Sequence, residues 1–277
     1  MRIIRYLDAA DNVGYASEQA DGSALAIEGD IYAEFKASKH KAQIRKRLAP
    51  IVPSILWCVG LNYKQHAKET NSKIPEYPVL FAKSPSALQN PEDPIEIPTH
   101  MRSDQVDFEC ELAVVIGKAA KNVTRDRAFG YVLGYTCAND VSARDWQIAR
   151  GGTQWCRGKT FDTFAPLGPC LVTKEEIPDP QTLRIQTILN GEVMQDWNTN
   201  DMIFDIPALI EFLSGSTTLL PGTVILTGTP HGVGLARNPP VWLKPGDTVS
   251  VVIDKIGTLS NPVQRESLAQ QALGASK

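Results

Sequence analysis

The sequence predicts an α+β protein that is rich in strands, has few long helices and carries a small N-terminal domain before a larger one. Short apolar runs bounded by glycine and proline recur along the 277 residues, and several of them alternate with period two. A clear amphipathic helix is predicted only near residues 205–215. Because the strands do not alternate with helices, the pattern argues against a Rossmann fold and against a TIM barrel.

Composition and charge favour a cytoplasmic enzyme. Hydrophobic content of 43% and charged content of 21% are ordinary for a globular protein. A net charge of −3 provides no basic field for nucleic acid or an anionic membrane, and no apolar run approaches the length of a membrane span. The N-terminus lacks the apolar region of a signal peptide. Five cysteines without a CxxC pair suggest free thiols in a reducing compartment.

The small N-terminal domain is predicted over residues 1–52. It begins with a strand at residues 2–7, and Asp21-Gly22 marks a hairpin turn. The basic segment from Lys39 to Leu48 is predicted to be a helix that ends before Pro50.

The larger domain is predicted over residues 53–265, before a flexible tail at 266–277. A buried strand is expected within 55–63, and the prolines of 70–100 indicate loops and short strands. Further strands are expected at 106–116 and 130–138. Asp205 is the expected N-cap of a helix that stops at Gly215. Two Pro-Gly turns then precede strands within 221–230 and 244–257.

The segment 106–116 carries acids at alternate positions of an otherwise apolar strand. Its even positions are all apolar, whereas its odd positions begin Asp107, Glu109, Glu111. The alternation directs Cys110 and its even neighbours into a core and places the carboxylates on the other face, about 7 Å apart. Close anions repel one another unless a positive charge lies among them. The segment is therefore either a solvated edge strand or part of a metal site.

Asp140 could add a third carboxylate to Glu109 and Glu111, because it follows the predicted strand 130–138. Three carboxylates with open positions suit Mg²⁺ or Mn²⁺ better than zinc. Lys159 lies in the apolar stretch RGKTFDTFAPLGP, where an unpaired lysine would be costly. One ammonium and one divalent cation would balance the three carboxylates. The alternative is a surface lysine in a loop.

His66 and Glu69 lie three residues apart in GLNYKQHAKE. A helical turn after Tyr63 would place them on one face. Glu69 could then hold the imidazole or share a water with it, which is a general-base arrangement. The alternative is a pair of surface neighbours.

Two more segments carry candidate ligand-binding groups. The stretch 227–234, TGTPHGVG, has glycines that let backbone amides approach a ligand, and Thr229 adds a hydroxyl. It lacks the spacing of nucleotide-binding loops, and a turn between strands is the alternative. Arg144 and Gln147 closely follow Asp140, and Arg144 would suit a substrate carboxylate. Their alternative is a polar turn or helix face.

Together these residues resemble the fumarylacetoacetate hydrolase (FAH) superfamily, in its branch of FAH-domain-containing proteins. The resemblance runs from about Leu56 to Val263 in seven ordered blocks: VGLNYKQHAKE, DFECELAVVIGK, NDVSARDWQ, GKTFDTFAPLGP, NGEVMQDWNT, PGTVILTGTPHGVG and LKPGDTVSVVI. It implies a mixed β-sheet roll or sandwich with flanking helices, usually as a homodimer.

The resemblance also implies the site and its chemistry. It implies that Glu109, Glu111 and Asp140 bind Mg²⁺ or Mn²⁺, with Ca²⁺ as a substitute, and that Lys159 lies near the metal. Substrate contacts are implied at Arg144, Gln147 and Thr229. A mobile lid is implied to carry His66 and Glu69. Members of the superfamily hydrolyse C–C bonds of acylpyruvates, decarboxylate oxaloacetate or tautomerise related oxo acids. Their common step is an enolate stabilised by a metal that a 2-oxo carboxylate chelates.

The sequence is therefore interpreted as a metal-dependent enzyme for a small 2-oxo or 1,3-dicarbonyl acid. C–C bond hydrolysis comes first, because His66 and Glu69 could activate water. The alternative is an oxaloacetate keto–enol tautomerase or decarboxylase. A non-catalytic oxo-acid-binding protein is the third interpretation.

Overall fold

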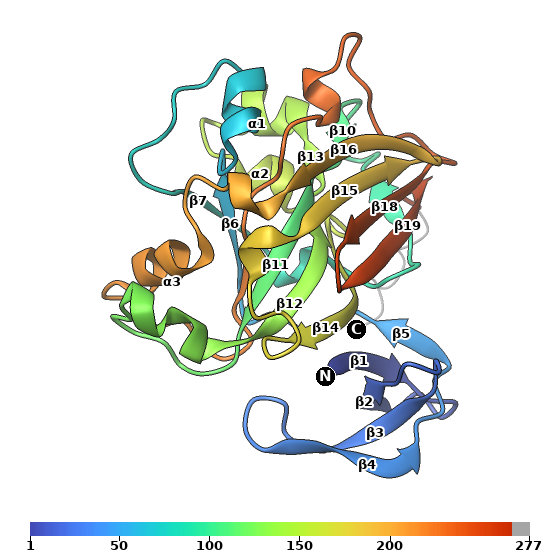
Figure 1. Cartoon of the computed structure of the whole chain (residues 1–277). Helices are drawn as coiled ribbons and strands as arrows, with labels where there is room; N and C mark the ends of the chain where they lie inside the picture. The colour runs from blue at the N-terminus through green and yellow to red at the C-terminus, as the bar shows by residue number, and fades with distance from the viewer. Residues whose placement is uncertain (268–277) are drawn as a thin grey trace, which may run out of the picture.

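Strands dominate the computed structural model, which describes residues 1–267 (Figure 1). The largest sheet contains β1 Arg2–Leu7, β2 Val13–Glu18, β3 Ala24–Gly29, β4 Phe35–Lys41, β5 Lys46–Leu48, β6 Leu56–Gly60, β7 Val79–Lys83, β8 Leu88–Gln89, β11 Cys110–Ile116, β12 Val132–Asn139, β14 Ala165–Thr173 and β17 Val224–Leu226. Its order is β4-β3-β2-β1-β14-β12-β11-β17-β6-β7, with β5 on β1 and β8 on β14. Most pairs are antiparallel, but β17–β6 and β14–β8 are parallel. The predicted mixed, strand-rich fold is thus confirmed.

A second sheet of five strands covers one side of the central strands (Figure 1). Its order is β16-β15-β18-β19-β9, and β10 pairs with β13 as a separate two-stranded ladder. The bounds are β9 Ile95–Ile97, β10 Val106–Asp107, β13 Ser142–Ala143, β15 Arg184–Leu189, β16 Glu192–Asn198, β18 Thr248–Ile253 and β19 Gly257–Arg265.

The α-helices are short: α1 Lys64–Glu69, α2 Cys156–Lys159 and α3 Ile206–Ser214. In α3 the predicted N-cap is confirmed, since Asp205 Oδ1 accepts a hydrogen bond of 2.9 Å from Ala208 N, and Gly215 follows its last residue. Within the described residues, no helix combines the length and apolar character that a membrane span requires.

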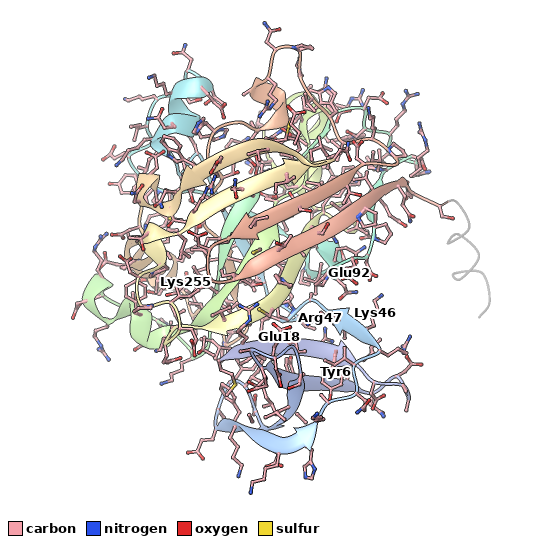
Figure 2. The ribbon with its side chains drawn as sticks, turned by 45° about the vertical axis from the view of Figure 1, so that its right-hand side comes forward. Tyr6, Glu18, Lys46, Arg47, Glu92 and Lys255 are labelled. Atoms are coloured by element: carbon pink, nitrogen blue, oxygen red, sulfur yellow. The ribbon has the colours of Figure 1, made fainter. Side chains whose placement is uncertain are left out.

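The first four strands extend the large sheet beyond β14. β1 pairs with β14 at Arg2↔Val172 and Ile3↔Leu171. The Arg2 guanidinium also donates to the carbonyl oxygens of Lys255 and Ile256, each at 2.9 Å. Figure 2 shows this junction beneath the five-stranded sheet. The predicted domain boundary at residue 52 stays a prediction.

The helix predicted from Lys39 to Leu48 is wrong. The segment contains the end of β4, which pairs with β3, and the whole of β5, which pairs with β1. Strand pairing overrides the helix propensity of its lysines and arginines and of Ala42. Lys46 and Arg47 are further held by ion pairs to Asp93 and Glu18.

Other predicted elements agree with the structure within a few residues. The strands expected at 2–7, 55–63 and 130–138 correspond to β1, β6 and β12. β2 and β3 form the hairpin predicted at Asp21-Gly22, although its connection spans 19–23. Glu266, the start of the predicted tail, accepts hydrogen bonds from Thr99 and His100, and residues 268–277 lie outside the described part.

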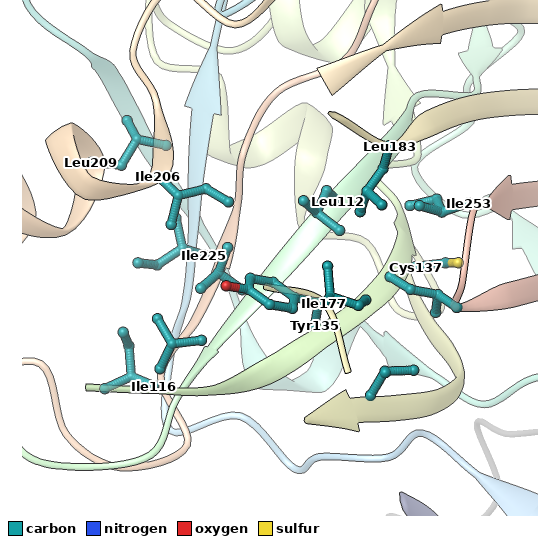
Figure 3. Close-up of a cluster of buried hydrophobic side chains, with 14 of the residues drawn as sticks. Leu112, Ile116, Tyr135, Cys137, Ile177, Leu183, Ile206, Leu209, Ile225 and Ile253 are labelled. Atoms are coloured by element: carbon teal, nitrogen blue, oxygen red, sulfur yellow. The ribbon is translucent and has the colours of Figure 1, made fainter. Parts of the chain in front are cut away.

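The main core lies between β11, β12, β17 and α3. Leu112 and Ile116 of β11 meet Tyr135 of β12 and Ile206 of α3 in this cluster (Figure 3). The even residues of β11 belong to it, as predicted. Ala113 and Val115 pack instead into a second cluster on the opposite face, so both faces of β11 are buried.

Candidate active site and metal centre

The strand predicted over 106–116 is interrupted where the acids lie. β10 ends at Asp107 and β11 begins at Cys110. Between them, the backbone N–H of Glu109 donates to Asn139 Oδ1, and that of Cys110 donates to Gln195 Oε1, both at 3.0 Å. Side chains therefore take the place of a continuous ladder at this point.

Glu109, Glu111 and Asp140 lie together, with one oxygen atom from each within 4.8 Å of the others. Antiparallel pairing of β11 with β12 brings them together, and Asp140 N donates to Glu109 O at 2.9 Å. All three side chains are buried, which excludes the alternative of a solvated edge strand. Cys110 points away from them and is 0% exposed, as the strand phase predicts.

Lys159 lies among these acids rather than on the surface. Its Nζ is 2.7 Å from Glu109 Oε2 and 2.8 Å from Asp140 Oδ2. Burial by itself would lower the pKa of Lys159, but the Asp140 and Glu109 carboxylates raise it above the ordinary lysine value. The ammonium also lies 5.0 Å from the centre of the Phe81 ring. Lys159 is therefore a buried, charged lysine.

Two buried charged residues of the site have partners that the sequence analysis did not predict. Lys83 pairs with Asp140 Oδ1 and donates to Val141 O at 3.0 Å. Asp107, grouped with the acids in the sequence, pairs with Arg144 at 2.8 Å instead. A lysine that ends the apolar run VLFAK was the available signal for Lys83, but it lies in the segment interpreted only as loops and short strands.

The donor set fits a divalent cation. Four buried carboxylates, those of Asp107, Glu109, Glu111 and Asp140, face the three buried cations Lys83, Arg144 and Lys159. Burial, then the carboxylates of Asp140 and Glu109, raise the pKa of Glu111 well above its ordinary value, whereas Gly228 N donates to its Oε2 at 2.7 Å. Burial would also raise the pKa of Glu109, but Lys159 and Arg144 lower it. A hard cation among these oxygens would offset the charge that Glu111 carries when ionised.

A cavity of about 280 Å³ opens over this cluster. Seven of the nine predicted site residues line it, whereas Glu69 and Asp140 do not; the seven are His66, Glu109, Glu111, Arg144, Gln147, Lys159 and Thr229. The rest of the wall is largely apolar and includes Leu61, Phe81, Ile148, Trp155, Val233 and Leu235.

His66 and Glu69 share one face of α1, as the helical turn predicts. His66 Nδ1 lies 2.7 Å from Glu69 Oε1, and both Glu69 oxygens accept from Gly232 N, at 3.0 and 2.9 Å. An ionised carboxylate only accepts hydrogen bonds, so Nδ1 carries the proton of the neutral imidazole. His66 Nε2 is then the atom that can accept a proton.

The hydroxyl of Thr229 is already engaged by protein groups. Its Oγ1 donates to Cys110 O at 3.0 Å and accepts from Gln195 Nε2 at 2.9 Å. The backbone N–H of Thr229, by contrast, makes no hydrogen bond to any part of residues 1–267. Because buried N–H groups are rarely left unpaired, this donor is suited to a ligand.

The comparisons identify the family. Residues 55–264 match the family "Fumarylacetoacetate (FAA) hydrolase C-terminal". A mitochondrial oxaloacetate tautomerase of Xenopus laevis is 52% identical over 217 residues, 78% of this chain and 67% of that protein. A mitochondrial oxaloacetate tautomerase of Homo sapiens is 50% identical over 217 residues, 78% of this chain and 68% of that protein. A solved structure, 5-carboxymethyl-2-hydroxymuconate delta-isomerase from Mycobacterium smegmatis, is 41% identical and has a TM-score of 0.84 over 96% of this chain and 100% of that one. This chain therefore belongs to the fumarylacetoacetate hydrolase family.

Proposed function

We propose that the protein is a divalent-metal-dependent tautomerase that interconverts the keto and enol forms of oxaloacetate. The cavity that combines an imidazole base with a buried acid cluster supports this reaction. Similarity to two oxaloacetate tautomerases, at 52% and 50% identity, favours it over the C–C hydrolysis that the sequence analysis placed first.

The exchange moves one proton between C3 and the oxygen on C2, and it consumes no water. His66 Nε2 is the proposed base that removes the C3 proton and, as imidazolium, delivers it to the oxygen on C2; ketonisation runs the same two transfers in reverse. The Glu69 carboxylate, which the Gly232 N–H holds in place, stabilises the imidazolium that forms.

Glu109, Glu111 and Asp140 would hold Mg²⁺ or Mn²⁺, with Ca²⁺ as a substitute. When bound, such an ion supplies a Lewis acid that polarises the 2-oxo group. Lys159 keeps its proton because its pKa is raised, so its ammonium can stabilise negative charge on the same oxygen. Gln147, Arg144 and the free Thr229 N–H are the proposed donors that bind and orient the substrate carboxylates.

Two further expectations accompany the proposal. The homodimer implied by the family resemblance stays a prediction, which sedimentation of the purified chain tests. The cytoplasmic location also stays a prediction, which imaging of the tagged protein tests, and both tautomerases compared above are mitochondrial by name.

The test follows oxaloacetate by enol absorbance and by NMR with wild type, His66→Ala and His40→Ala, in Mg²⁺. Wild type should equilibrate keto and enol forms without cleavage. His66→Ala should slow this by about 10²–10⁴-fold, which is the usual contribution of a general base. His40→Ala should match wild type, because His40 is exposed on β4. The proposal would be contradicted if the enzyme forms pyruvate from oxaloacetate, or if it cleaves an acylpyruvate and does not interconvert the keto and enol forms of oxaloacetate.

A further inference from the structure

We propose that Asp107 is a positioning residue: through Arg144, its carboxylate orients the Gln147 side-chain amide so that the NH₂ group faces the substrate. The inference rests on the proposed function, since it requires an anionic 2-oxo acid in the cavity. Asp107 itself does not line that cavity.

The two oxygens of Asp107 hold different parts of the site. Oδ1 accepts from Phe108 N and Gly234 N, both at 2.8 Å. Oδ2 accepts from Leu235 N at 3.0 Å and from Arg144 Nε at 2.9 Å. Oδ1 therefore anchors the segment that carries the cavity wall, whereas Oδ2 also fixes the guanidinium.

The guanidinium of Arg144 determines which way the Gln147 amide faces. Arg144 Nη1 donates to Gln147 Oε1 at 2.9 Å, and Arg144 Nη2 lies 2.8 Å from both Asp107 Oδ2 and Glu109 Oε1. A guanidinium has donors only, so the amide oxygen must face it. The Gln147 NH₂ group makes no hydrogen bond within residues 1–267 and is left for a ligand.

A carboxylate is required at position 107 because every group around it donates a hydrogen bond. Asparagine would keep one acceptor, but its NH₂ group would face either the N–H groups of Phe108 and Gly234 or those of Leu235 and Arg144. In the second orientation Arg144 Nε would lose its acceptor, and in both orientations the negative charge opposite the guanidinium would be gone, so the Gln147 amide could turn its oxygen toward the substrate. An amide oxygen repels an anion that the NH₂ group attracts.

The experiment measures Mg²⁺ affinity and, in saturating Mg²⁺, oxalate affinity by calorimetry. The variants are Asp107→Asn, Gln147→Ala, the double variant and Asp247→Asn. Asp247 is a matched control, because it is a buried aspartate that accepts from Lys244 N and Asn190 Nδ2 and does not line the cavity.

Each single variant should bind oxalate about tenfold more weakly or worse, as the loss of a hydrogen bond to a charged group predicts. Mg²⁺ affinity should change by less than about twofold, because the three ligands remain. Asp107→Asn should add almost nothing on top of Gln147→Ala, since the two act in series. With oxaloacetate, Asp107→Asn should raise KM more than it lowers kcat. Asp247→Asn should bind oxalate like wild type.

Independent, additive losses from the two single variants would overturn the inference, as would unchanged oxalate binding by Asp107→Asn. If Asp107→Asn does not fold, Arg144→Lys replaces it in the same cycle, because lysine cannot donate to Asp107 and Gln147 with the guanidinium geometry. Wild type that binds Mg²⁺ but no oxalate would overturn the proposed function itself, and that result is separate from the comparison of variants.

Discussion

Among Glu109, Glu111 and Asp140, only Glu111 has no ion pair with a lysine or arginine of residues 1–267. Its neighbours Glu109 and Asp140 are each paired with cationic side chains, whereas Glu111 accepts from the Gly228 backbone. Burial and the two neighbouring acids raise its pKa, so the folded protein without metal favours protonated Glu111. Its contribution to stability is full at low pH and is lost as pH rises from the ordinary value of 4.5 through the raised pKa.

Glu111→Gln therefore separates stability from metal binding. The glutamine mimics the protonated acid, so we expect the metal-free variant to melt above wild type at pH 8. Mg²⁺ should stabilise wild type but not the variant, because one ligand charge is gone. Thermal melts with and without Mg²⁺, from pH 6 to 8, measure both effects. A metal-free variant that melts below wild type throughout this range would contradict the assignment.

Lys83 is the second residue whose replacement has a clear expectation. Lys83→Met leaves the buried Asp140 short of one partner and should lower the free energy of unfolding by about 3–5 kcal/mol in urea titrations. Lys36→Met is the control, since its side chain is 78% exposed and it should change stability by no more than about 0.5 kcal/mol. A loss below about 1 kcal/mol at Lys83 would mean that Lys159 alone compensates Asp140.

The sequence predicted the members of the site better than their partners. Glu109 and Glu111 could be named from alternation, Asp140 from its place after a predicted strand, and Lys159 from the free-energy cost of burying a lone lysine. The pairing of Lys83 with Asp140 could not be predicted, because the two lie 57 residues apart and only the folded sheet brings them together. For the same reason, the pairing of Asp107 with Arg144 was not predicted.

At the level of elements, strand phase was predictable and strand continuity was not. The even residues of β11 lie in the core as alternation requires. The break between β10 and β11 depends on acceptors from Asn139 and Gln195, which are remote in sequence. The basic segment from Lys39 to Leu48 was wrongly predicted as a helix for a related reason. Its local helix propensity is outweighed by pairing with β1 and β3, which lie elsewhere in the sequence.

Strand phase predicts which thiols react. Cys58, Cys110, Cys137 and Cys170 are buried, whereas Cys156 at the start of α2 is partly exposed. Burial also raises the pKa of Cys110 well above the usual thiol value. One thiol per native chain should therefore react rapidly with a maleimide, and mass spectrometry should place it at Cys156. Cys156→Ser should abolish this rapid labelling. Rapid labelling of Cys110 in the native protein would show that the phase of β11 is wrong.

At the scale of the whole molecule, residues 1–52 contribute side chains to the same two hydrophobic clusters as the rest of the chain. Ile4 and Tyr6 belong to the cluster that contains Leu112, while Ile3 belongs to the one that contains Val115. Removing these strands would also leave an edge of β14 unpaired.

We therefore expect a chain that starts at residue 53 to melt at least about 10 °C below the full chain, or to aggregate. Circular dichroism melts at matched concentration, with light scattering, measure this. A truncated chain that melts within a few degrees of the full chain would instead support an autonomous domain beginning at the predicted boundary.

The buried carboxylates and lysines in and next to the cavity lie on β7, β11 and α2 or directly beside an end of β11 or β12, whereas much of the apolar wall of the cavity comes from connecting segments. Leu61 follows β6, Ile148 and Trp155 lie between β13 and α2, and Leu235 follows β17. In directed evolution, these wall positions could be randomised together while the charged residues are kept. Libraries built this way would test whether new substrate preferences arise by exchange of loops on an unchanged reaction centre, and whether a single ancestral scaffold could diversify into enzymes for different oxo acids by the same route.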